Sequence, residues 1–171
     1  MTFLSQAFVH ARWTGMWHRR IGTDVFGQYQ YNEFLRLLVR GVGGGGARVE
    51  AVHHPRFLFW GGAGYLFEYN RVRVAPGATD PPETYEHRLT TYMTGRLSLW
   101  RDQLLLQNTL YWQPRLDAFG DVRVLEECEA QVRISELLSL GVTVSVLYDS
   151  APPTAVQTTD LRLFTALKIE I

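Results

Sequence analysis

The strict alternation of apolar and polar side chains, from about residue 86 to the C-terminus, is the sequence feature that most constrains the fold. A β-strand points successive side chains to opposite faces, so alternation with a period of two predicts a strand with one apolar face. No segment shows the longer period of an amphipathic helix. We therefore predict an all-β protein built as one curved sheet. The clearest apolar face consists of Leu138, Leu140, Val142, Val144, Val146 and Tyr148, which alternate with Ser139, Gly141, Thr143 and Ser145.

The predicted strands number about nine and follow one another as an antiparallel up-and-down meander. Each is near the roughly 9 to 11 residues that a tilted strand needs to cross a bilayer. We therefore expect a transmembrane β-barrel or the C-terminal part of one. The expected strands cover residues 3–16, 23–31, 35–49, 57–69, 88–100, 103–113, 122–134, 138–149 and 160–171.

The connections after the fourth expected strand alternate between longer loops and short turns. Proline and glycine mark the loops at 75–86, 114–120 and 150–159, whereas 101–102 and 135–137 form short turns. One rim of the barrel is therefore trimmed and the other elaborated, which is typical of outer-membrane barrels. Residues 53–55 are expected to turn the chain into the fourth strand.

The odd number of strands places the N-terminus on the rim opposite the C-terminus, whereas a closed single-chain barrel normally has an even number. Residues 1–6 do not open a charged and then apolar signal peptide. We therefore expect residues 1–171 to form a single β-barrel domain that lacks its N-terminal strands and signal peptide.

The charge balance and the cysteine content exclude several classes of protein. The 17 basic and 17 acidic residues cancel, so no long-range field gathers nucleic acid, and we expect no nucleic-acid partner. Cys128 is the only cysteine, which excludes an internal disulfide. No run approaches the roughly 18 apolar residues of a membrane-spanning helix.

Alternation alone leaves open whether the apolar face points inward, as in a soluble barrel, or outward into lipid. Aromatic residues near the strand ends favour lipid, because amphipathic rings gather at membrane interfaces. A polar face that carries both charges favours pairing across a narrow lumen. The possible interface aromatics are Trp13, Trp17, Trp100, Trp112 and Tyr148, and the possible lumen-facing polar cluster is Arg88, Arg96, Arg123, Glu127, Glu129 and Arg133.

Glu126 interrupts the apolar face of the seventh expected strand, between Val124 and Cys128. A charge at the bilayer midplane costs on the order of a few kcal/mol. We therefore expect Glu126 to lie near a rim.

The remaining motifs point to structure rather than chemistry. Gly43 to Gly46 lack the Gly-Lys-Ser/Thr of a phosphate loop, and we expect a sharp bend whose bare backbone is covered by aromatic rings from 57–69. His53 and His54 would point to opposite faces of a strand, so a turn is favoured over a metal site. His10 and His87 are expected to be polar groups of the lumen. No catalytic residues, metal ligands or cofactor site can be named, and we predict a protein that is not an enzyme.

Several stretches resemble the salt-induced outer-membrane protein family, also called YdiY-like. They are Tyr-Trp-Gln-Pro-Arg-Leu-Asp-Ala-Phe-Gly-Asp-Val-Arg-Val at 111–124, residues 138–147, Tyr-Asp-Ser-Ala-Pro-Pro-Thr at 148–154, and Thr-Thr-Asp-Leu at 158–161. The resemblance is best over residues 85–171 and continues back to Phe3, through 26–34 and the glycine-rich third strand. The chain departs from the family in its missing signal peptide and first strands, and in ending with Ile171 rather than an aromatic residue.

The resemblance implies a β-barrel of unknown specific function in the outer membrane of a Gram-negative bacterium, with a role in stress or as a narrow channel. It implies membrane lipid and the barrel-assembly machinery as partners, and no catalytic residues. Residues 117–121 and 148–153 correspond to recurrent loop motifs of the family.

Two other functions remain open at this point. A soluble barrel would bind a small apolar ligand inside, with Phe57, Phe59, Tyr65 and Leu140 lining the cavity. A barrel hydrolase acting on lipids would need a serine or histidine whose replacement abolishes turnover.

Overall fold

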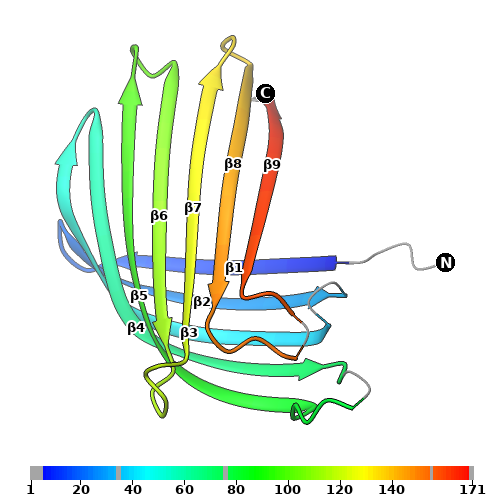
Figure 1. Cartoon of the computed structure of the whole chain (residues 1–171). Helices are drawn as coiled ribbons and strands as arrows, with labels where there is room; N and C mark the ends of the chain where they lie inside the picture. Colours follow the sequence, from blue (N-terminus) through cyan, green and yellow to red (C-terminus); the bar gives the residue numbers. More distant parts are fainter. Residues whose placement is uncertain (1–5, 34–35, 75–76, 155, 170–171) are drawn as a thin grey trace.

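The computed structural model describes residues 6–33, 36–74, 77–154 and 156–169, and nine strands account for most of them (Figure 1). The predicted strand ends at Phe3, Leu35 and Ile171 lie outside the described residues. The strands are β1 (Gln6–Met16), β2 (Ile21–Asn32), β3 (Leu37–His54), β4 (Phe57–Val72), β5 (Glu83–Leu99), β6 (Leu104–Pro114), β7 (Val122–Arg133), β8 (Leu138–Asp149) and β9 (Thr159–Ile169).

All nine strands belong to one sheet, in which each strand pairs antiparallel with the next along the chain. The sheet forms a half-barrel with β1 and β9 at its edges, which confirms the all-β meander of about nine strands. Two boundaries were predicted wrongly by five residues: β5 begins at Glu83, inside the predicted loop, and β3 continues past Val49. His53 and His54 continue β3 and pair with Leu58 and Phe57, so the turn before β4 comprises only Pro55 and Arg56.

The sheet turns a corner along β3, β4 and β5, which are its longest strands at 18, 16 and 17 residues. In Figure 1 β4 and β5 curve, so that β1–β3 cross behind the upright β6–β9. Gly46 and Gly64 pair directly at this corner. A Cβ on either would lie 2.3 Å from a carbonyl oxygen of the neighbouring strand, that of Ala63 or Gly45 respectively. Only glycine permits so close an approach, so the glycine run forms the predicted bend.

The rings that cover this corner are not the predicted ones. Most aromatic residues of β4 lie on the opposite, convex face, as the exposure of Phe57, Tyr65 and Phe67 shows, whereas Trp60 lies on the concave face beside Arg48. A Cβ on Gly44 would instead lie 2.6 Å from the ring of Phe26 in β2, and one on Gly62 would lie 2.5 Å from Tyr92 in β5. The neighbouring strands on either side therefore supply the cover, because their rings share the concave face with the glycines.

The two faces of the sheet have the reverse of the usual burial pattern. The concave face buries polar side chains, including Asp24, Glu68, Arg88, Thr94 and Ser145. The convex face carries the apolar side chains, and those of β9 are 61–69% exposed. A protein folded in water normally buries its apolar side chains. In this structure the sheet instead curves so that its apolar face is the outer one. The exposed residues of β9 are Leu161, Leu163, Leu167 and Ile169.

The connections also divide the half-barrel into two unlike rims. The short-turn rim carries the β1–β2, β3–β4, β5–β6 and β7–β8 turns, and β9 ends there. The long-loop rim carries the β2–β3 turn and the longer β4–β5, β6–β7 and β8–β9 loops. The predicted alternation of loop lengths after the fourth strand is confirmed. Among the described residues, no helix is long and apolar enough to cross a membrane.

Candidate functional site

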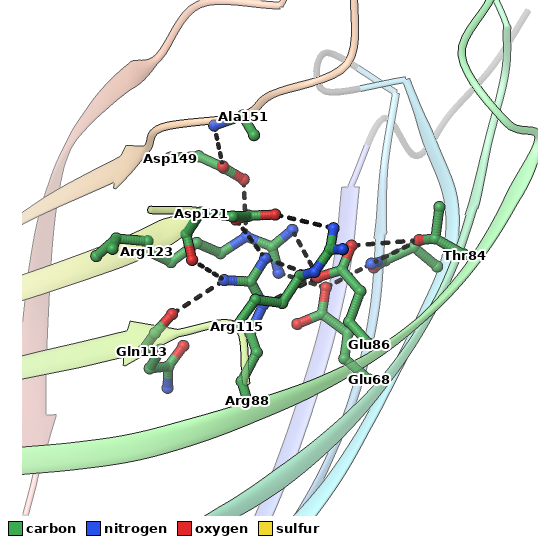
Figure 2. Close-up of polar contacts among 12 residues, drawn as sticks. Glu68, Thr84, Glu86, Arg88, Gln113, Arg115, Asp121, Arg123, Asp149 and Ala151 are labelled. Carbon is green, nitrogen blue, oxygen red and sulfur yellow. Dashed lines mark hydrogen bonds and ion pairs between the residues drawn. The ribbon is translucent and has the colours of Figure 1, made fainter. Parts of the chain in front are cut away.

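Charged side chains converge on the concave face just inside the long-loop rim, where they form a continuous set of ion pairs (Figure 2). We call this set the rim network. Its members come from β3, β4, β5, β7, β8 and the β6–β7 loop, so residues far apart in the sequence meet there. They are Arg40, Glu68, Glu86, Arg88, Arg115, Asp121, Arg123 and Asp149.

Glu68 lies at the centre of the rim network and its side chain is 0% exposed. One carboxylate oxygen accepts a hydrogen bond from Arg40 Nη2 at 2.9 Å, and the other accepts from Arg123 and from Asn70. A buried carboxylate loses its hydration, and these charged donors replace it. Glu68 therefore ties β3 and β4 to β7 across the concave side.

Arg123 carries the network onward to the last strands of the sheet. Its Nε donates to Asp149 Oδ2 of β8 at 2.7 Å, and its Nη2 lies 3.8 Å from Glu86 Oε2 of β5. The planar guanidinium presents donors in several directions at once, which a lysine ammonium could not do with the same geometry. Arg123 thus contacts three carboxylates from three different strands.

Arg88 holds the β6–β7 loop against the sheet. Its side chain is 1% exposed, and it donates to Glu86 Oε2 at 2.7 Å and to Asp121 Oδ1 at 2.8 Å. A further bond runs from Nη1 to the carbonyl oxygen of Gln113 at 2.9 Å. The contacts of Arg88 with Glu86, Asp121 and Gln113 can be followed in Figure 2. The loop is therefore anchored by charge rather than by apolar packing.

Arg115 forms the solvent-side end of the network. Its Nη1 lies 3.1 Å from Asp121 Oδ2, and its Nε and Nη2 donate to the two oxygens of Asp117 at 2.7 and 2.8 Å. This bidentate bonding lowers the pKa of Asp117 to about 2 and raises that of Arg115. The pair therefore stays ionised under all physiological conditions.

A cavity of about 250 Å³ lies beside the rim network and beneath the loops of the long-loop rim. The network forms part of its wall through Arg40, Arg115 and Arg123, and proline side chains form another part. Two of the loops are joined above the strands. The backbone N–H of Thr154 and its hydroxyl donate to the two carboxylate oxygens of Asp80, at 3.0 and 2.9 Å.

A second polar cluster on the concave face fastens the edge strand β1 to the middle of the sheet. Arg12 Nη2 donates to Tyr111 Oη of β6 at 3.1 Å, and its guanidinium lies 5.7 Å from the ring centroid of Tyr92. Tyr92 in turn donates to Asp24 of β2. These bonds cross the concave side, so β1 and β2 are held opposite β5 and β6 although they are not paired with them.

The six predicted lumen residues lie on the same face but do not all join the same cluster of contacts. All six lie on the concave face, since their positions in β5 and β7 have the same parity as the buried polar residues there. Arg88 and Arg123 enter the rim network. Arg96, Glu129 and Arg133 lie nearer the short-turn rim and belong to neither cluster. Glu127 lies in the middle of β7 and interacts electrostatically with Arg12 of the second cluster.

The five predicted interface aromatics are all exposed and fall toward both rims. Trp17 and Trp100 lie in turns of the short-turn rim, and Trp13 lies on the convex face near that rim. Trp112 and Tyr148 lie near the long-loop rim, on either side of Val124 at the same register.

Two further predictions, the position of Glu126 along its strand and the face that carries His87, were wrong. Glu126 is on the convex face as expected, but in the middle of β7 rather than near a rim. It accepts a hydrogen bond from Asn108 Nδ2 of β6 at 3.0 Å. His87 lies on the convex face, where its Nδ1 is 2.5 Å from Tyr65 Oη, so it is not a lumen residue. Among the described residues no group of histidine, cysteine and carboxylate side chains suits a metal ion.

Six members of the network lie outside the predicted lumen cluster: Arg40, Glu68, Glu86, Arg115, Asp121 and Asp149. A weak signal was present in the spacing, because Glu68 and Asn70, and likewise Glu86 and Arg88, stand two residues apart on one face of a strand. The pairing partners are 33 and 55 residues away, for Arg88 with Asp121 and for Glu68 with Arg123, and no local pattern connects them.

A curved antiparallel meander with a polar concave face, an apolar convex face and unequal rims defines a β-barrel-like protein. The chain belongs to the family described as "Protein of unknown function, DUF481", which it matches over residues 5–170. This assignment agrees with the resemblance to the YdiY-like family. No curated protein and no solved structure matches the chain.

Proposed function

We propose that this protein is a non-enzymatic β-barrel of the bacterial outer membrane whose interior is closed near the long-loop rim. The observation that carries the proposal is the exposed apolar convex face. The four exposed side chains of β9 alone leave on the order of 5 kcal/mol of hydrophobic free energy unrealised in water. A typical domain is stable by only about 5–15 kcal/mol, so a whole face of this kind needs an apolar covering.

Lipid is the covering that fits the convex face. The five predicted interface aromatics lie toward both rims, as in the two interfacial girdles of outer-membrane barrels. The loops also have the asymmetry of such barrels, with short turns on one rim and long loops on the other.

The directions of the edge strands support a barrel with further strands. Because successive strands are antiparallel, β1 and β9 run in the same direction. Direct pairing between them would be parallel, whereas an odd number of additional strands would close the sheet with antiparallel pairs throughout. We therefore propose that the nine strands belong to one barrel domain, which the barrel-assembly machinery inserts.

The rim network favours a structural or interaction role, or a narrow channel, over a wide pore. Glu68 and Arg123 meet directly although β5 and β6 lie between their strands, so side chains fill the concave side there. Wide pores instead leave an aqueous lumen.

The alternative of a soluble barrel with an apolar ligand inside is not supported. Phe57, Tyr65 and Leu140 were predicted to line an internal cavity, but they are exposed on the convex face. Phe59 has the same parity as Phe57 in β4 and shares that face. The lipid hydrolase has no support either, since His87 contacts Tyr65 rather than a nucleophile.

Cell fractionation tests the proposal. The protein, expressed from its own locus, is expected to sediment with outer membranes and to migrate faster in detergent gels before boiling than after it. Heat-modifiable migration reports a closed barrel that resists the detergent. A soluble protein with unchanged migration would contradict the proposal.

A further inference from the structure

The turns of the short-turn rim carry more positive than negative charge. Three of the four turns contain arginine, and we call these side chains the turn arginines. They are Arg19 and Arg20 in the β1–β2 turn, Arg56 in the β3–β4 turn and Arg101 in the β5–β6 turn, against which stand the acidic residues Asp102 and Glu136. All four turn arginines are exposed, and within the part of the chain that the structure describes none of their guanidinium groups forms an ion pair or a hydrogen bond. Their charge is therefore free to meet an anion from outside.

The long-loop rim differs, because its exposed arginines have carboxylate partners. Arg71 Nε lies 3.6 Å from Glu83 Oε1, and Arg73 Nη1 lies 3.5 Å from Glu33 Oε1. The connections of that rim also contain more acidic than basic residues, four against three. The excess of positive charge is therefore a property of the short-turn rim alone.

Each of the three turns also places an exposed aromatic side chain next to its arginine. The neighbours are Trp17 with Arg19 and Arg20, Phe57 with Arg56, and Trp100 with Arg101. Trp17 lies toward the convex face, because its Nε1 donates to the hydroxyl of Thr23 at 2.9 Å and Thr23 shares that face with the exposed Val25. Aromatic rings at the rims of a barrel lie at the level of the lipid headgroups. The turn arginines therefore reach the same level.

The distribution of the turn arginines fits a layer of anions rather than one compact ligand. The β1–β2 and β5–β6 turns are four strand spacings apart, which is roughly 19 Å along the sheet. No single small anion spans that distance. A lipid layer instead offers a separate phosphate to each turn, and a guanidinium group can donate two parallel hydrogen bonds to a phosphate.

We propose that the short-turn rim binds anionic phospholipid headgroups of the phosphatidylglycerol type, with the turn arginines pairing with the lipid phosphates. The inference rests on the proposed function, because it requires a bilayer around the convex face. Each basic side chain near an anionic membrane surface strengthens binding roughly fivefold. Only lipids that touch this rim gain the full effect, so the preference averaged over all lipid in contact with the barrel should be about twofold to threefold.

The test uses the full chain reconstituted in phosphatidylcholine vesicles that contain a trace of spin-labelled lipid. Electron spin resonance measures how much of each labelled lipid the protein immobilises, and hence the association of phosphatidylglycerol relative to phosphatidylcholine. This ratio should be about two to three in about 0.1 M sodium chloride, where the Debye length is about 10 Å. In about 1 M salt the Debye length is about 3 Å, and the ratio should fall toward one.

Two double variants show whether the turn arginines are responsible. Arg56→Gln with Arg101→Gln should move the ratio about halfway toward one, because half of the turn arginines are lost. Arg96→Gln with Arg133→Gln is the matched control, since it removes the same charge from the concave side of the same rim and should leave the ratio unchanged.

The outcomes separate this inference from the proposed function. Immobilised lipid with a ratio of one in the unmodified protein, or a ratio that salt does not change, would overturn the inference and leave the proposed function standing. An equal change in both double variants would overturn it too, since net charge alone would then set the preference. If neither labelled lipid is immobilised, the proposed function fails and the inference fails with it. The salt dependence of the unmodified protein keeps the test decisive if a variant does not fold.

Discussion

Glu68 of β4 and Arg123 of β7 form a buried ion pair between residues 55 positions apart in the sequence, with two strands of the sheet between them. The pair shows how tightly the sheet is curved near the long-loop rim, because side chains from non-adjacent strands meet across its concave side. Arg40 extends the pair to β3. Asp149 extends it to β8 (Figure 2). With Glu86 and Arg88 of β5, the network therefore connects five of the nine strands at this level.

Replacement of Glu68 should destabilise the fold strongly. Glu68→Gln leaves Arg40 and Arg123 with one fewer carboxylate between them, and breaking a buried pair in this way costs about 3–5 kcal/mol. The measurement is the free energy of unfolding in urea. Glu136→Gln, in the exposed β7–β8 turn, is the control and should change stability by less than about 0.5 kcal/mol. Similar small changes in both variants would show that the network adds nothing to stability.

The glycine corner predicts unequal effects for two positions in one glycine run. A Cβ on Gly46 meets backbone atoms of β4 at 2.3 Å, whereas one on Gly43 has nothing within 4 Å. Gly46→Ala should therefore destabilise the protein by about 1–3 kcal/mol through overpacking, and Gly43→Ala by less than about 1 kcal/mol. Thermal unfolding followed by circular dichroism compares them. Equal unfolding temperatures for the two variants would mean that the corner does not require a glycine at position 46.

Glu126 provides a test of what covers the convex face. In a lipid bilayer, Glu126→Gln should raise the free energy of unfolding by roughly 1 kcal/mol, because a neutral amide is easier to place in hydrocarbon and still accepts from Asn108. Urea titration in lipid vesicles, followed by tryptophan fluorescence, measures this. In the control Glu136→Gln, stability should not change. If neither variant alters stability, the middle of β7 does not face hydrocarbon.

The ion pair between Arg115 and Asp117 should stabilise the β6–β7 loop, and this stabilisation should be lost at low pH. The pKa of Asp117 is lowered to about 2 from an ordinary value of 3.8, so the ionised form is favoured in the folded state. The stabilisation is therefore present above about pH 3.8 and is lost as the pH falls toward about 2. A carbon-detected NMR titration of the Asp117 carboxyl measures the midpoint. Arg115→Met should return it toward 3.8, and a midpoint near 3.8 in the unmodified protein would disprove the pairing.

The alternation of residues determined the strands and which side chains share a face. Leu138 to Tyr148 shows this most clearly, since a period of two admits only a strand and its two faces follow directly. Proline and glycine determined the loops, and the glycine run determined a bend. These features depend on local backbone geometry, which a single segment of sequence carries.

Only the tertiary structure decided which face is the inner one and which charges meet. The direction of curvature is a property of the whole sheet, and no single strand encodes it. That direction placed Glu68 and Arg88 inside and Glu126 outside. It also brought Arg123 to Glu68 while leaving Arg96 and Arg133 apart from the network. Ion pairs between distant strands depend on register and curvature together, and the sequence pattern specifies neither of these for residues so far apart.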